Sequence, residues 1–100
     1  MAARLPATDL TNPDTVAYFT WDAPMTVREI HEVLRTAPEQ DRLTLLGKIL
    51  REARDTEVWH FTTPEFVIAN FEKLRPHLGR RRSFWEWLLR RWREEGMIGA

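Results

Sequence analysis

Cysteine is absent from this chain of 100 residues, and several other features that would narrow its function are scarce. Without cysteine there are no disulfides, zinc fingers, iron–sulfur clusters or thiol chemistry. No apolar run approaches the roughly 18 residues that a membrane-spanning helix needs. The first 24 residues also lack the apolar centre of a signal peptide, so we expect a cytoplasmic protein with no membrane partner.

An excess of charge of one sign is also absent, because 15 basic residues balance 15 acidic residues. This balance excludes a uniformly basic nucleic-acid coat protein. Residues suited to catalysis are sparse as well. The three histidines lie far apart, the four glycines stand alone, and the single serine, Ser83, is explained as a helix cap. We therefore expect no enzyme activity, no metal and no cofactor.

The composition that remains is that of a folded domain. Hydrophobic residues make up 43% of the chain and charged residues 30%, which is typical of soluble globular proteins. A chain of this length suits one domain that buries roughly two-thirds of its unfolded surface. Pro6, Pro13 and Pro24 mark residues 1–24 as an irregular N-terminal arm, which leaves residues 25–100 as the helical domain.

Helical periodicity runs through residues 25–100. Apolar residues recur at the spacing of an α-helix, which predicts helices over about 26–36, 37–53, 63–75 and 83–95. Each predicted helix opens with a capping box, in which a hydroxyl and a glutamate three positions later bind free N–H groups of the first turn. The four pairs are Thr26 with Glu29, Thr36 with Glu39, Thr62 with Glu65, and Ser83 with Glu86. The sequence thus predicts an all-α fold, a compact bundle of about four short amphipathic helices. The apolar segment 54–62 is expected to pack on these helices.

Basic residues concentrate toward the C-terminal end of the chain. Residues 73–93 hold eight basic residues and one acidic residue, whereas the first 72 residues are net acidic. Arg80, Arg81 and Arg82 are adjacent, repel one another, and precede the positive N-terminal end of the last helix. One interpretation is a docking patch for a carboxylate-rich partner or for phosphates. The other interpretation is a solvated turn.

One tryptophan of the last predicted helix is out of place. The apolar residues of this helix share one face, which the domain core explains, but Trp87 projects on the opposite, polar side near Arg91. Tryptophan and arginine are enriched at interface hot spots, so a partner contact is one explanation. The alternative is that the arm or the segment 54–62 folds across Trp87 and covers it.

The arm carries an apolar cluster of its own between Val16 and Trp21. This segment could add to the sheet edge of a partner or lie in a groove, with Phe19 and Trp21 as partner-binding residues. It could equally wrap the helices of its own chain. Nothing in the sequence decides between these two arrangements.

Four stretches of the chain resemble a family of short bacterial proteins. They read MTVREI at 25–30, LGKILREARD at 46–55, WHFTTPE at 59–65 and LGRRRSFW at 78–85. These stretches are similar to small helical proteins encoded beside nucleotidyltransferase toxins of the abortive-infection (AbiEii-like) type. The resemblance covers about residues 25–95. It implies an antitoxin or accessory subunit of a toxin–antitoxin system, which binds a nucleotidyltransferase and holds it inactive through protein–protein contact.

The arginine cluster and Trp87 give a hypothesis for the inhibitory contact. Arg80, Arg81, Arg82 and Trp87, with Arg91 alongside, would face such a toxin. A nucleotidyltransferase site must hold metal-binding acidic residues, with which arginines can pair. Larger antitoxins of such systems carry a winged DNA-binding domain that is not evident in this chain, so the resemblance does not extend to regulation by DNA binding.

Two other functions stay open at the level of sequence. The first two predicted helices, joined at residues 36–37, could form a helix-turn-helix, with the basic block binding nucleic-acid phosphates. Against this reading, the candidate recognition helix carries Glu39, Asp41 and Glu52, which phosphates would repel. Alternatively, the chain self-associates and buries Trp87 across a symmetric interface.

Overall fold

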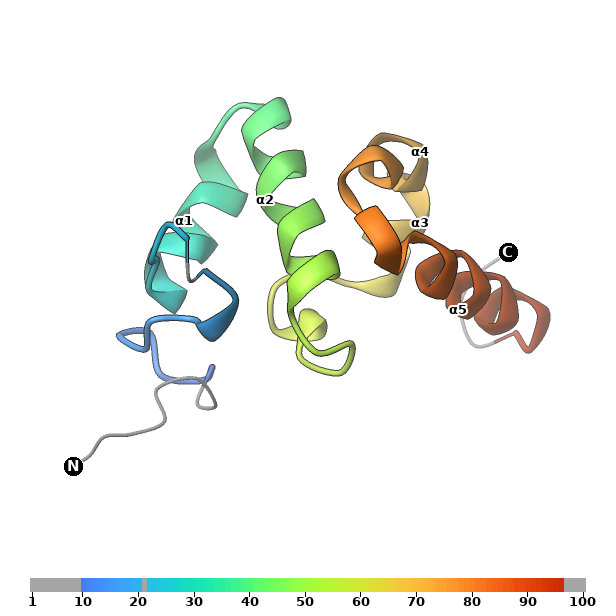
Figure 1. The fold of residues 1–100 in the computed structure, drawn as a ribbon, viewed down its shortest axis with the longest axis horizontal. Coiled ribbons are helices and arrows are strands. Elements are labelled where there is room, and N and C mark those ends of the chain that lie inside the picture. The colour runs from blue at the N-terminus through green and yellow to red at the C-terminus, as the bar shows by residue number, and fades with distance from the viewer. Residues whose placement is uncertain (1–9, 21, 97–100) are drawn as a thin grey trace.

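Helices account for nearly all regular structure in the computed structural model, which describes residues 10–20 and 22–96 (Figure 1). The α-helices of these residues are α1 (Val27–Thr36), α2 (Glu39–Glu52), α3 (Pro64–Ala69), α4 (Phe71–Leu74) and α5 (Arg82–Glu94). The short 3-10 helices are η2 (Tyr18–Thr20), η3 (Val58–His60), η4 (Arg75–His77) and η5 (Gly79–Arg81). The predicted all-α bundle with an irregular N-terminal arm is confirmed. None of the described helices combines the length and the apolar character needed to cross a membrane.

The first helix, α1, begins where the sequence predicted it. The Thr26 hydroxyl accepts a hydrogen bond from the N–H of Glu29 (3.1 Å), and the Glu29 carboxylate accepts one from the N–H of Thr26 (2.8 Å). This capping box is therefore confirmed. The arm is tied to the same place, because Val16 forms an isolated antiparallel bridge with Thr26 and the N–H of Ala17 donates to the Met25 carbonyl at 3.0 Å.

The central element is α2, which contacts α1 on one side and α4 on the other (Figure 1). It runs alongside α1 in the opposite direction. The predicted cap of α2 is wrong. Thr36 is the last residue of α1, where its hydroxyl donates to the Glu32 carbonyl (2.8 Å), and Pro38 occupies the N-cap without a side-chain hydrogen bond.

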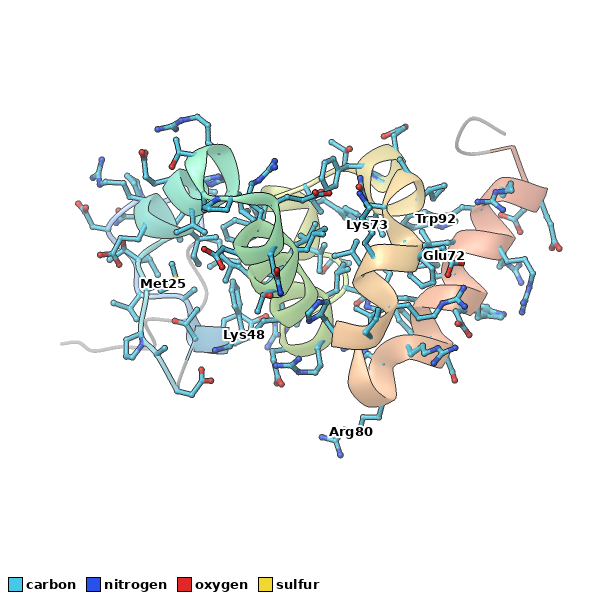
Figure 2. All side chains as sticks on the ribbon, turned by 90° about the horizontal axis from the view of Figure 1, so that it is seen from above. Met25, Lys48, Glu72, Lys73, Arg80 and Trp92 are labelled. Atoms are coloured by element: carbon cyan, nitrogen blue, oxygen red, sulfur yellow. The ribbon has the colours of Figure 1, made fainter. Side chains whose placement is uncertain are left out.

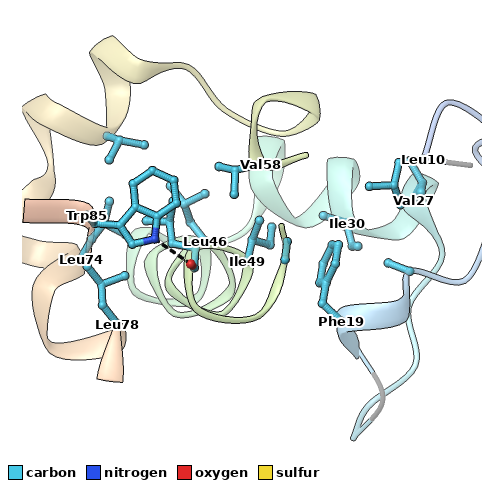
Figure 3. Packing of buried hydrophobic residues seen from close by; sticks show 14 of the residues in the cluster. Leu10, Phe19, Val27, Ile30, Leu46, Ile49, Val58, Leu74, Leu78 and Trp85 are labelled. Atoms are coloured by element: carbon cyan, nitrogen blue, oxygen red, sulfur yellow. Dashed lines mark hydrogen bonds between the residues drawn. The ribbon is translucent and has the colours of Figure 1, made fainter. Parts of the chain in front are cut away.

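Two residues far apart in the sequence complete the C-terminal end of α2. The carbonyls of a last helical turn have no partner within their own helix. The indole N–H of Trp85, in α5, donates to the Leu50 carbonyl at 2.8 Å (Figure 3). The Tyr18 hydroxyl, in the arm, accepts from the N–H of Arg54 (2.8 Å) and donates to the Glu57 carboxylate. The arm and α5 thus hold the same end of α2.

The single helix predicted over 63–75 is broken into α3 and α4. Asn70 separates them with φ −114° and ψ 15°, and its side-chain amide donates to the Phe66 carbonyl (3.0 Å). Asparagine side chains compete in this way with helical backbone bonding. The cap is also shifted by one residue. The hydroxyl of Thr63, not that of Thr62, accepts from the N–H of Phe66 (3.1 Å).

The last helix, α5, has no hydroxyl cap, so the predicted capping box of Ser83 is wrong. Arg81 is the N-cap and makes no side-chain capping bond, and Ser83 lies within the first turn. The reason is that η5 leads directly into α5. The N–H of Arg82 already donates to the carbonyl of Gly79, whose φ of +54° makes the turn. Glu86, the other half of the predicted box, instead lies 3.1 Å from the Nε of Arg82.

The buried apolar side chains form one core that extends on both sides of α2 (Figure 3). Its members are Leu10, Ala17, Phe19, Val27, Ile30, Leu46, Ile49, Leu50, Ala53, Val58, Val67, Leu74, Leu78, Trp85 and Leu89. The segment 54–62 packs on the helices as predicted, because Val58 is fully buried and the Trp59 ring lies edge-on to Trp85 (5.8 Å between centroids). Residues 10–20 contribute to the same core, so this part of the arm belongs to the folded unit.

Candidate functional site

One face of α5 is anchored in the core and another face is open to solvent. Trp85 and Leu89 are buried, and the Trp92 ring lies 5.6 Å from that of Trp59, so the segment 54–62 covers the inner side of the helix. On the outer side, 47% of the Trp87 surface is exposed. The described part of the arm and the segment 54–62 therefore leave about half of the Trp87 surface exposed.

Four side chains stack along this outer side of α5 and the turn before it. The guanidinium of Arg81 lies over the Phe84 ring, 4.7 Å from its centroid. The Phe84 and Trp87 rings follow at 6.3 Å with an interplanar angle of 39°, and the Arg91 guanidinium lies 5.7 Å from the Trp87 centroid. Spacings of three and four residues place such side chains on one helix face. We call Arg81, Phe84, Trp87 and Arg91 the arginine–aromatic ladder.

The arginines at this surface differ in how their charge is satisfied. Arg82 pairs with Glu86 at 3.1 Å, and Arg91 pairs with Glu95 at 3.0 Å. Arg80, Arg90 and Arg93 form no ion pair within the part of the chain that the structure describes. Figure 2 shows the Arg80 side chain projecting away from the body of the fold. The turn before α5 thus presents a free guanidinium beside the ladder.

Phe84 belongs to this surface although helical periodicity predicted it on the core-facing side of α5. The ring is half-buried and packs against the core as predicted, but it also lies between Arg81 and Trp87. The spacing of three residues from Arg81 to Phe84 and from Phe84 to Trp87 was the signal that could have identified the ladder. The structure therefore extends the predicted surface by one aromatic side chain.

The predicted partner-binding residues of the arm do not join this surface. Phe19 is only 1% exposed and lies edge-on to Tyr18 and Phe61, with centroids 5.3 and 5.7 Å away. A ring buried in its own core cannot meet a partner in this fold, so the assignment of Phe19 as a contact residue is wrong. Trp21, the other predicted contact of the arm, lies outside the described residues.

The acidic residues of α2 weigh against the hypothesis that α1 and α2 form a DNA-binding helix-turn-helix. Glu39 and Asp41 occupy its first turn, both are exposed, and Glu39 pairs with Lys73 at 2.7 Å. This ion pair lowers the pKa of Glu39 below its usual value, so the carboxylate is charged at neutral pH. The turn that a recognition helix would direct toward DNA therefore carries two exposed carboxylates, one of them paired with Lys73.

The candidate site is thus the outer face of α5 with its arginine–aromatic ladder, together with Arg80 in the turn that precedes this helix. It consists of side chains suited to contact rather than to bond making or breaking. No known protein family matches this chain, and neither does a curated protein or a solved structure.

Proposed function

We propose that this chain is a non-enzymatic, antitoxin-like protein that binds and neutralises a nucleotidyltransferase-type toxin through the outer face of α5. The observation that carries this proposal is Trp87, which keeps 47% of its surface exposed within a row of guanidinium groups. The resemblance of residues 25–95 to small proteins encoded beside such toxins supplies the class of partner. The proposed contact residues are Arg80, Arg81, Arg82, Trp87 and Arg91.

The ladder is suited to a contact surface because contacts with the rings restrict its arginines. The guanidinium groups of Arg81 and Arg91 lie over the Phe84 and Trp87 rings and keep N–H groups available for a partner. A side chain that is ordered before binding loses less conformational entropy in the complex. An exposed indole supplies apolar area at the centre, and tryptophan and arginine dominate interface hot spots.

The charge of this surface suits an acidic partner. A nucleotidyltransferase holds its metal ions with acidic side chains, and guanidinium groups pair with carboxylates in a bidentate manner. Binding of Arg80 and its neighbours at that acidic site would block metal and nucleotide together. Neutralisation by occlusion needs no chemistry from this chain.

Binding measurements with a purified nucleotidyltransferase of the AbiEii-like type test this proposal. We expect an R80E/R81E/R82E variant to weaken the complex by about tenfold or more and to release toxicity in cells. We expect W87A to weaken it to a similar degree. A matched variant, R28E/R35E/R54E, reverses three exposed arginines elsewhere and should bind nearly as tightly as the wild type. Unchanged affinity of both α5 variants would remove this mechanism.

The competing functions give different results in two further experiments. A nucleic-acid-binding regulator would shift DNA or RNA in a gel with a steep dependence on salt, because phosphate contacts release counterions. A self-associating bundle would scatter light as a dimer or larger species and would protect Trp87 from solvent quenchers. For the protein-binding function we expect a monomer without a salt-dependent gel shift.

A further inference from the structure

A second feature of α5 is the groove of about 380 Å³ that it forms with α3 and α4, which we call the α5 groove. Five of its nine lining residues are charged, and no residue of the arginine–aromatic ladder is among them. Sites for small molecules are lined mostly by apolar and aromatic side chains with a few polar groups. A groove with this share of charged side chains suits a charged segment of a macromolecule better.

Two arginines of the α5 groove have no charged partner. Arg90 and Arg93 line the groove from α5, and both residues are exposed. Neither takes part in an ion pair or a cation–π contact within residues 10–20 and 22–96. Their spacing of three residues places both side chains on the same side of the helix, so one segment of a partner can meet both guanidinium groups.

The two acidic residues of the α5 groove have partners of their own. Arg75 pairs with Glu72 at 3.0 Å and with Glu86 at 3.4 Å. Glu86 is also paired with Arg82, at 3.1 Å. Each carboxylate of the groove therefore already has a guanidinium beside it, and the positive charges of the two unpaired arginines are left over.

The α5 groove also has an apolar part. Leu89 lines it from α5 and is buried, whereas Ile68 and Phe71 line it from α3 and α4 and are half-buried. An apolar side chain of a partner would lose water-exposed surface against these three residues. Charged groups beside an apolar patch fit a protein segment that carries both kinds of side chain.

A nucleic acid fits the same groove less well. Nucleic-acid binding draws its affinity from several phosphate contacts along the backbone, and here two free guanidinium groups share the groove with two carboxylates. Nucleic acids also lack aliphatic side chains that could pack against Ile68 and Leu89. Guanidinium groups bind carboxylates through two parallel N–H donors, so acidic side chains suit Arg90 and Arg93 directly.

We propose that the α5 groove binds a short acidic segment of a partner protein. Two carboxylates of that segment pair with Arg90 and Arg93, and an apolar side chain beside them lies against Phe71 and Leu89. The inference goes beyond the function proposed above, because the groove shares no residue with the ladder and its test does not require a nucleotidyltransferase.

Titration of the full-length wild-type protein with three peptides at low salt tests this inference. The peptides are acetyl-EELEELEE-amide, its neutral analogue acetyl-QQLQQLQQ-amide, and acetyl-EESEESEE-amide, which keeps the acids but lacks the leucines. We expect saturable binding of the first peptide, and binding of the other two that is weaker by about tenfold. Equal binding of the acidic and neutral peptides would overturn the inference. Tighter binding of a short oligothymidylate than of the first peptide would overturn it in favour of a nucleic acid.

The place of binding is read from nuclear magnetic resonance spectra of the same titration. The methyl resonances of Ile68 and Leu89 should shift with the first peptide, because both residues line the groove. Shifts confined to the indole N–H of Trp87 would show that the peptide binds the ladder instead and would overturn the inference. That result would leave the function proposed for the ladder intact, so the two proposals fail separately.

Two double variants separate a binding role of these arginines from a structural role. R90Q/R93Q removes both charges, so it should abolish the preference for the acidic peptide while leaving the thermal midpoint close to that of the wild type, because neither side chain is paired within the described fold. In the control R35Q/R54Q, Arg35 lies in the last turn of α1, as Arg93 does in α5, and Arg54 is exposed. This control should keep the preference. A preference retained in R90Q/R93Q would overturn the inference, and the wild-type titration remains decisive if that variant does not fold.

Discussion

At the scale of the residue, Gly47 shows most directly how closely the elements approach. It lies in the middle of α2, where helix propensity alone favours alanine. A Cβ built on Gly47 would lie 2.2 Å from the Cβ of His77, which is far closer than two carbon atoms can approach. The Cβ of His77 is fixed to the backbone and cannot rotate away. Glycine is therefore required here for packing.

We predict that Gly47→Ala destabilises the protein by about 1–3 kcal/mol, because η4 must move away from α2. Urea denaturation followed by circular dichroism measures this loss. The double variant with His77→Gly removes the opposing Cβ and should recover part of it. A more stable Gly47→Ala protein would mean that propensity outweighs packing at this position.

The pKa of the Tyr18 phenol reports on the contact between the arm and Glu57. Partial burial, followed by the hydrogen bond to Glu57, raises the pKa of its phenol above the ordinary value of 10.0. Since the folded-state pKa exceeds the unfolded-state pKa, the stabilisation is fully present below about pH 10 and is lost as the pH rises through the folded-state pKa.

Tyr18 is the only tyrosine of the chain, so the tyrosinate absorbance reports on it alone. We predict a titration midpoint above 10.0 in the folded protein and an ordinary midpoint in denaturant. Glu57→Gln removes the neighbouring negative charge and should lower the midpoint toward the ordinary value. An identical midpoint in the folded and denatured protein would show that the hydroxyl is not engaged by Glu57.

At the scale of the element, the start of α3 separates two adjacent threonines. Thr63 caps the helix through the N–H of Phe66, whereas the Thr62 hydroxyl makes no such bond. We predict that Thr63→Ala costs about 1 kcal/mol, the usual effect of removing an N-cap, and that Thr62→Ala costs less than half as much. Thermal unfolding of both variants provides the comparison. A larger loss of stability in Thr62→Ala than in Thr63→Ala would show that Thr62 caps α3, as the sequence pattern predicted.

The helices themselves were predictable, because apolar periodicity depends on local geometry. Their ends were less so. A hydroxyl three residues before a glutamate occurs at four places, yet only the pair at Thr26 forms the predicted box. The N-terminal ends of the other helices depend on neighbouring turns, such as the 3-10 turn η5 that leads into α5. Such turns follow from tertiary packing.

For the candidate site too, the features that depend on local helical spacing were predictable, whereas those that depend on tertiary contacts were not. Helical spacing placed Trp87 on the outer face of α5, and the structure agrees. The burial of Phe19 depends on contacts between segments distant in the sequence. Phe19 meets Phe61 across 42 positions of the chain. Periodicity within one helix carries no information about such a contact.

At the scale of the whole molecule, residues 10–20 of the arm share one hydrophobic core with the helical domain. The domain boundary at residue 25 separates Leu10, Ala17 and Phe19 from the core that they help to fill. We predict that a chain beginning at Met25 is strongly destabilised or unfolded, since Phe19→Ala alone should cost about 3–5 kcal/mol. Denaturant titration of both proteins checks this expectation.

Val16→Ala is the matched control for the arm. Val16 lies three residues from Phe19 but is 43% exposed, so its truncation should cost about 0.5 kcal/mol or less. A stable chain beginning at Met25 would mean that the core closes without the arm.

The C-terminal end of α2 is completed by a phenol from residue 18 and an indole from residue 85. During synthesis the ribosome releases the first of these groups long before the second. A nascent chain that ends before α5 therefore leaves the Leu50 carbonyl without its donor and the core without its largest ring. We therefore expect the core to close only after α5 has emerged, so the segment that displays the arginine–aromatic ladder would also be the segment that completes folding.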